Sequence, residues 1–145
     1  MPRYNTVINS TWNVDQAFAF MSDFSNAARW DPGVVSAQRL DEGKVRIGSS
    51  FDLTVAFAGR RMRLRYTVRS LDPPHRVVFV ASTSRLESVD SLTFEQLGDG
   101  CRMTYDADLR LTGLAAVANP VLALGFRRVG DRARDSLRSV LTSKR

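Results

Sequence analysis

Apolar residues repeat with a period of two through the middle of this chain and with a helical period on either side of it. Between Met103 and Leu111, every second residue is apolar and the residues between them are charged or polar. Such alternation is typical of a strand with one buried and one solvated face. The pattern therefore predicts an antiparallel sheet whose outer face is exposed to water.

The expected strands are separated by residues that favour turns. Gly59 falls between two of them, and Gly98-Asp99-Gly100 tolerates the positive φ of a hairpin turn. Pro73-Pro74 ends another strand, because proline donates no ladder hydrogen bond. After a first strand at residues 3–10, we expect six more: from residue 34 onward, then 51–57, 62–69, 77–81, 86–97 and 101–111.

Two short helices are expected between the first strand and the others. The first would have Ser10 or Thr11 as its N-cap and continue for about three turns. Its apolar residues have the helical spacing i, i+3, i+4 and i+7, at Val14, Ala17, Phe18 and Met21. A second helix within residues 23–30 would end near Pro32, because a residue before proline avoids the helical region.

A long helix is expected from Pro120 to Leu141, with Asn119 as N-cap and proline at the first helical position. One stripe of this helix is apolar, at Leu122, Phe126, Val129, Ala133, Leu137 and Val140. The opposite side is charged, at Arg127, Asp131, Arg134, Asp135 and Arg138. We therefore expect the apolar stripe to pack on the sheet.

Length and composition favour one folded domain over residues 1–145, and we expect a monomer. The first residues lack the apolar run of a signal peptide, so the cytoplasm is the expected compartment. Cys101 and His75 are the only residues of their types, which excludes an internal disulfide and a Cys/His zinc site. No phosphate loop or haem or flavin signature is present, so no cofactor is expected. The excess of arginine over lysine fits a GC-rich bacterial genome.

The net charge of +6 is concentrated in two blocks, residues 60–76 and 127–145, each of which carries +5. A ladder of arginines, Arg61, Arg63, Arg65 and Arg69, falls on the outer face of one strand. Phosphate binding uses arginines in this way, so RNA, the ribosome or an anionic membrane remains an alternative partner. A solvated surface is favoured, because Asp52, Asp106 and Asp108 are available on outer strand faces as ion-pair partners and no nucleic-acid motif is present.

Almost the whole chain resembles the START-like (SRPBCC) superfamily, in particular its polyketide cyclase/dehydrase and lipid-transport branch. The resemblance rests on short motifs spread along the sequence: Asp23-Phe24, Arg29-Trp30-Asp31-Pro32-Gly33, Gly48, the segment 71–79 around Pro73-Pro74-His75, and the segments 92–95 and 98–105. It implies an α+β helix-grip fold, in which a curved antiparallel sheet of about seven strands encloses a cavity against the C-terminal helix. A fold of this kind does not determine an activity.

Asp90 is the candidate acid or base. If strand alternation holds from residue 86 to residue 94, Asp90 faces the interior, where an apolar environment would raise the pKa of its carboxyl group. The alternative is a bulge, or a position near the strand end, that leaves Asp90 in contact with water or an arginine. His75 follows two prolines in a turn, so we interpret it as a surface residue, and Cys101 begins a strand, which leaves no nucleophilic arrangement.

Aromatic residues on apolar faces are candidate ligand contacts, and each is equally compatible with a role in core packing. Tyr66 and Tyr105 would direct hydroxyl groups into the cavity. The resemblance places Trp30 near the cavity mouth. Phe57, Phe79 and Phe126 complete the expected set of wall residues.

Three functions are therefore open. The first is binding or transport of a small hydrophobic ligand, such as a lipid, polyketide or isoprenoid. The second is a cofactor-free cyclase or dehydratase of polyketide type, in which Asp90 and a tyrosine transfer protons. The third is an interaction module that uses the basic surface. The first is favoured, because the resemblance implies a cavity and no convincing catalytic set is present.

Overall fold

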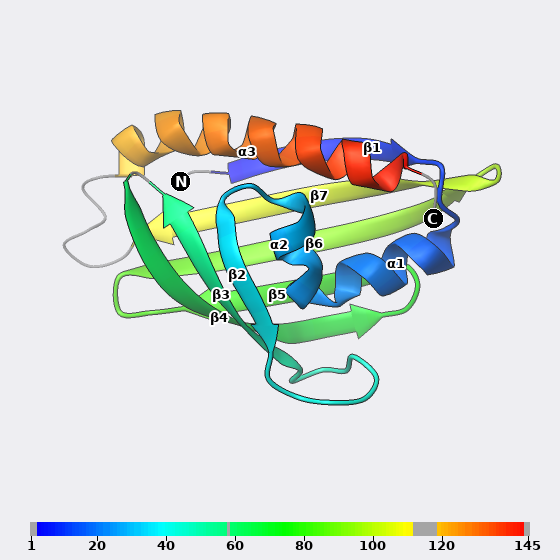
Figure 1. Ribbon diagram of the computed structural model, residues 1–145, viewed down its shortest axis with the longest axis horizontal. Helices are drawn as coiled ribbons and strands as arrows, with labels where there is room; N and C mark the ends of the chain where they lie inside the picture. Colours follow the sequence, from blue (N-terminus) through cyan, green and yellow to red (C-terminus); the bar gives the residue numbers. More distant parts are fainter. Residues whose placement is uncertain (1–2, 58, 112–118, 144–145) are drawn as a thin grey trace.

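The computed structural model describes residues 3–57, 59–111 and 119–143, and of these the side chains of Phe57 and of residues 119–126 lie outside the description. A seven-stranded sheet curves around one long helix, with short helices after the first strand (Figure 1). The elements are β1 (Arg3–Ser10), α1 (Val14–Ser22), η1 (Phe24–Asn26), α2 (Ala27–Trp30), β2 (Val34–Arg39), β3 (Ser50–Phe57), β4 (Arg60–Asp72), β5 (Arg76–Ser82), β6 (Leu86–Leu97), β7 (Gly100–Leu111) and α3 (Asn119–Leu141).

The strand order β1-β7-β6-β5-β4-β3-β2 makes β1 and β2 the two edges of the sheet. Every neighbouring pair is antiparallel, as the alternating sequence predicted. The strands β2 to β7 follow one another along the chain, and β1 joins the far side of β7. This order places the N-terminal strand beside α3, which runs along β1 in Figure 1.

The inner face of the sheet is tightly packed at one end and partly uncovered at the other. Under η1, the ring of Phe24 stacks on that of Phe79 with centroids 4.3 Å apart, and Phe51 meets both rings edge-on. At the other end, the inward residues of β7 from Ala107 to Leu111 are only half-buried. Burial therefore decreases along the strands, and the inner face is incompletely covered at the end where these residues of β7 lie.

Helix α1 begins at Val14 and is capped by Asn13, whose side chain accepts a hydrogen bond from the backbone N–H of Gln16. The prediction of Ser10 or Thr11 as the cap was therefore wrong. The hydroxyl of Ser10 instead accepts from Trp12 N and donates to the carbonyl oxygen of Leu141, over 2.6 Å. The Ser10 hydroxyl therefore binds the C-terminal end of α3. Sequence spacing does not reveal this contact between distant parts of the chain.

Helix α3 begins at Asn119, one residue before the predicted start, and its cap position at residue 118 lies outside the described residues. Its last turn is tied to the turn between β1 and α1. Thr11 N donates to the Leu141 carbonyl at 3.2 Å, and the Trp12 indole N–H donates to the Ser143 carbonyl at 2.8 Å. The helix is thus held at its C-terminal end by the end of the first strand and the turn that follows it.

The arginine ladder lies on the outer face of β4, where all four arginines are exposed. Arg65 pairs with Asp52 directly across the sheet, with Nε 2.9 Å from Oδ1. Asp106 does not meet the ladder, because β5 and β6 separate β7 from β4; it pairs instead with Arg3 on β1. His75 is exposed in its turn, as expected.

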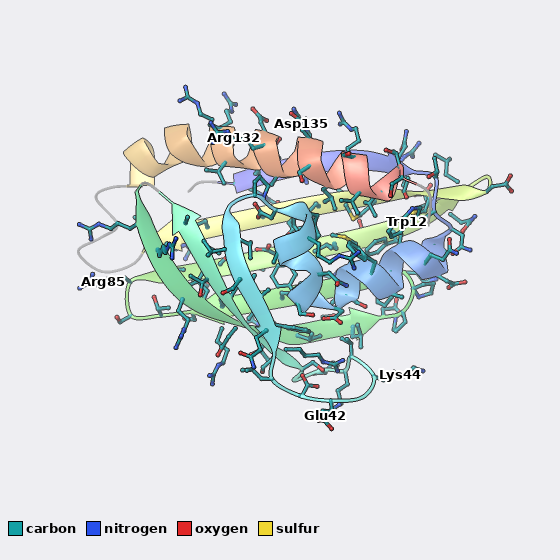
Figure 2. All side chains as sticks on the ribbon, viewed as in Figure 1. Trp12, Glu42, Lys44, Arg85, Arg132 and Asp135 are labelled. Carbon is teal, nitrogen blue, oxygen red and sulfur yellow. The ribbon has the colours of Figure 1, made fainter. Side chains whose placement is uncertain are left out.

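The side of α3 that faces away from the sheet is charged. Figure 2 shows Arg132 and Asp135 projecting outward from it. No helix within the described ranges is both long enough and apolar enough to cross a bilayer.

Candidate ligand-binding cavity

A cavity of about 150 Å³ lies between the inner face of the sheet and α3. Much of its wall is aliphatic, formed by Val55, Met62, Leu64, Ala107, Leu109 and Val129. Several of these side chains are only half-buried, although they point toward the interior of the protein. Strand alternation directs them inward, and the gap between sheet and helix leaves part of their apolar surface uncovered.

A chain of hydrogen bonds forms the polar part of the cavity wall and connects β4, β6 and β7. The Tyr66 hydroxyl donates to Ser88 Oγ at 2.9 Å, and Ser88 Oγ donates to Asp90 Oδ1 at 3.2 Å. The Tyr105 hydroxyl donates to the other carboxylate oxygen of Asp90. These four residues are buried and all line the cavity.

Register explains how this polar group is assembled. Asp90 lies opposite Ala107, and Leu92 lies opposite Tyr105, so the carboxyl group and the phenol sit diagonally across the β6–β7 pair. No irregularity interrupts the pairing of β6 with β7. Asp90 therefore faces inward as the alternating pattern predicted, and the bulge considered as the alternative is absent from this pair.

Burial raises the pKa of the Asp90 carboxyl group to about 6, although the hydrogen bonds from Tyr105 and Ser88 act in the opposite direction. Burial also raises the pKa of both tyrosine hydroxyls, and the negative charge of Asp90 raises it further. Both phenols therefore stay protonated near neutral pH and act as donors. The Asp90 carboxyl group therefore changes its protonation state closer to neutral pH than an exposed aspartate does.

Trp30 and Asp31, at the end of α2, form another part of the wall. The Trp30 ring meets the Tyr105 ring edge-on, with centroids 5.6 Å apart. Asp31 Oδ1 accepts a hydrogen bond from Gly33 N at 2.8 Å. Burial raises the pKa of the Asp31 carboxyl group, so a second carboxyl group lies in a poorly solvated part of the same cavity.

Helix α3 closes the cavity from the side opposite the sheet. A Cβ atom added at Gly130 would lie 2.5 Å from Cδ2 of Tyr4, so glycine lets the helix lie directly on the tyrosine ring. The Tyr4 hydroxyl donates to Asp131 Oδ1 at 2.6 Å, which fixes β1 against the helix. Arg134 also lines the cavity, and its guanidinium pairs with Asp131 and Asp135.

The structure brings together four of the seven residues expected at the site: Trp30, Tyr66, Asp90 and Tyr105. Phe79 is fully buried against Phe24 in the packed half of the sheet and is not among the cavity residues. The side chains of Phe57 and Phe126 lie outside the described residues.

Sequence reasoning did not propose Ser88 or Asp31 as site residues. Ser88 had a usable signal, since it and Asp90 are two polar residues in succession on an otherwise apolar strand face. Asp31 was interpreted as part of a helix stop before Pro32 and of the family motif at residues 29–33, and not as a site residue. Its position in the cavity depends on tertiary packing.

The sequence matches the family described as polyketide cyclase/dehydrase and lipid transport over residues 1–142. The chain therefore belongs to this family, as the sequence motifs indicated. No curated protein matches the sequence significantly.

Solved structures share the fold at low sequence identity. A START superfamily protein from Mycobacterium smegmatis superposes with a TM-score of 0.78 at 13% identity, with 96% of each chain covered. The ginseng major latex-like protein 151 from Panax ginseng gives a TM-score of 0.69 at 12% identity, with 97% of each chain covered. The di-domain aromatase/cyclase BexL of the BE-7585A biosynthetic pathway gives 0.68 at 17% identity, and there the match spans 97% of this chain and 45% of the other. These similarities establish a START-like fold.

Proposed function

We propose that this protein binds or transports, in the cytoplasm, a small apolar molecule that carries one hydrogen-bonding group. The observation that carries the proposal is an incompletely covered apolar surface that leads to a buried polar group. Apolar side chains that fold inward without being covered leave a favourable place for an apolar ligand. Asp90, Ser88 and the two tyrosines supply the few convergent polar atoms that orient a ligand in such a site.

The volume of the cavity limits the size of the ligand that it can hold. Pockets for drug-sized ligands begin at roughly 300 Å³, and this cavity measures about 150 Å³. An apolar cavity of about 150 Å³ holds a molecule the size of benzene. The proposed ligand therefore has one ring or a short chain, and a complete lipid would need a wider separation of α3 from the sheet.

Filling the cavity tests this proposal. Ala107 lies on the inner face of β7 and lines the cavity, so Ala107→Phe places a ring in the proposed site. Thr104→Phe adds a similar ring to the outer face of the same strand and is the control. We expect benzyl alcohol to shift the amide resonances of cavity residues in the wild type and in Thr104→Phe, and not in Ala107→Phe.

Two results would contradict ligand binding at this site. One is the absence of any shift in the wild type at millimolar benzyl alcohol. The other is equal binding to wild type and a folded Ala107→Phe variant. Native mass spectrometry followed by organic extraction of the purified wild type would identify any natural ligand that remains bound.

A second candidate function, proton transfer of the cyclase or dehydratase type, is favoured by one observation. Asp90 has a pKa of about 6, close to the value at which a carboxyl group serves as a general base near neutral pH. Its carboxylate would remove a proton from a carbon next to a ligand carbonyl. The Tyr105 hydroxyl, which donates to Asp90 before this transfer, would then donate its hydrogen bond to the enolate oxygen instead.

Hydrogen exchange into a neutral ketone tests this chemistry directly. Phenylacetone in deuterated water exchanges a benzylic proton for deuterium when a base removes the proton and a deuteron from the solvent replaces it. We expect the wild type to accelerate this exchange and Asp90→Asn to abolish the acceleration. Equal exchange rates with the two proteins would eliminate Asp90 as the base, while leaving the binding proposal intact.

A further inference from the structure

The cavity contains two carboxyl groups, and the described residues offer neither of them a cationic partner. Asp90 accepts bonds from two hydroxyl groups, and Asp31 accepts one from a backbone N–H. Neither aspartate forms an ion pair with any of the arginines that the structure describes. A buried carboxylate without a counter-charge is costly, so the cavity favours a positively charged occupant.

The one cationic side chain among the described cavity residues is already neutralised. Arg134 lies 3.4 Å from Asp131 Oδ1 and 3.1 Å from Asp135 Oδ1, on the outer side of α3. It therefore has two carboxylates of its own on the helix. Arg134 therefore does not pair with Asp90 on β6 or with Asp31 at the end of α2.

Aromatic rings surround the same space. Trp30, Tyr66, Tyr105 and Tyr4 all line the cavity, and the faces of such rings attract cations. Trp30 is adjacent in sequence to Asp31, and its ring meets that of Tyr105, which is bonded to Asp90. Carboxylates and aromatic rings together form the environment that recognises an organic ammonium group.

We propose that the preferred ligand is a small organic amine in its protonated form, with one apolar ring or a short chain and one ammonium group. Asp31 is the direct partner of the ammonium, because its Oδ2 accepts no hydrogen bond from a described residue. Asp90, with its oxygens engaged by Ser88 and Tyr105, adds negative potential beside it. This inference rests on the proposed ligand-binding function and specifies the chemical class of the ligand.

Three probes of nearly equal size and different charge separate this inference from binding in general. Benzylamine is a cation at pH 7, benzyl alcohol is neutral and benzoate is an anion. Dissociation constants would be measured by NMR titration at 150 mM salt, where exposed charges are largely screened. We expect benzylamine to bind at least about tenfold more tightly than benzyl alcohol, and benzoate to bind most weakly.

Variants that each remove one negative charge then identify the aspartate that contacts the ammonium group. Asp31→Asn is expected to remove most of the preference for benzylamine over benzyl alcohol. Asp90→Asn is expected to reduce the preference by a smaller factor. Asp99→Asn removes the same charge from an exposed turn and is the matched control, with no change expected.

The outcomes distinguish the two proposals. Benzyl alcohol binding as tightly as benzylamine overturns the amine class and leaves the cavity as a neutral binding site. The absence of binding by all three probes overturns both proposals. If Asp31→Asn does not fold, the order of the three probes on the wild type decides the ligand class by itself.

Discussion

Replacing Asp90 by asparagine should change how the stability of the protein depends on pH. Burial raises the pKa of the Asp90 carboxyl group from 3.8 to about 6 in the folded state. The folded protein therefore holds this proton more tightly than the unfolded chain does, and stability falls as pH rises through this range. A shift of roughly two units corresponds to about 3 kcal/mol, of which about 2 kcal/mol falls between pH 4 and pH 6.

The assay is denaturation by urea at several pH values from 4 to 7, with wild type and Asp90→Asn compared at each. Taking the difference in free energy of unfolding removes the contributions of groups that titrate alike in both proteins. We expect the wild type to lose about 2 kcal/mol relative to the variant between pH 4 and pH 6. Asp99→Asn, in an exposed turn, should follow the wild type.

A constant offset between the two curves would come from the altered hydrogen bonds to Tyr105 and Ser88 and carries no information about charge burial. The slope of the difference is the diagnostic quantity. If the difference varies by less than about 0.5 kcal/mol over the whole range, with equal denaturant dependence in both proteins, Asp90 is not a buried, uncompensated carboxyl group. The argument that the cavity favours a positively charged ligand would then also fail.

Two further predictions concern how α3 is held on the sheet. Gly130→Ala places a methyl group 2.5 Å from Cδ2 of the Tyr4 ring, and we expect this overpacking to cost about 1–3 kcal/mol in thermal unfolding; an unchanged melting temperature would contradict the close contact. Ser10→Ala removes the hydroxyl that donates to the Leu141 carbonyl, at an expected cost of about 1–3 kcal/mol. It should also accelerate amide exchange in the last turn of α3, and unaltered exchange there would speak against the bond.

The fold could be predicted from the sequence because hydrophobic periodicity records local geometry. The alternation from Met103 to Leu111 places the side chains of β7 on its two faces as the structure has them. The N-cap of α1 was predicted wrongly, because Ser10 and Asn13 are both good capping residues. What distinguishes them is the end of α3, more than a hundred residues away, which engages the Ser10 hydroxyl.

The site could be predicted in part, for the same reason. The inward position of Asp90 follows from alternation along β6. Phe79 also faces inward, but it packs under Phe24 and does not line the cavity. A local sequence pattern does not indicate which end of a strand a helix covers. Asp31 enters the cavity because α2 packs near α3, where a Cβ on Gly33 would lie 3.9 Å from Cγ1 of Val129.

The hydrogen bonds at the last turn of α3 make that end a pivot, and the bond from Tyr4 to Asp131 holds the helix a second time, ten residues from Leu141. Ser10, Thr11 and Trp12 hold its last turn, at the red end of the helix in Figure 1, against the turn that follows β1. A helix of 23 residues is about 34 Å long at 1.5 Å per residue. A rotation of about 5° around the held end therefore moves the opposite end by about 3 Å. Small angular changes at this pivot would therefore alter the width of the cavity, and the hydrogen bond from the Tyr4 hydroxyl to Asp131 is the contact that opposes them.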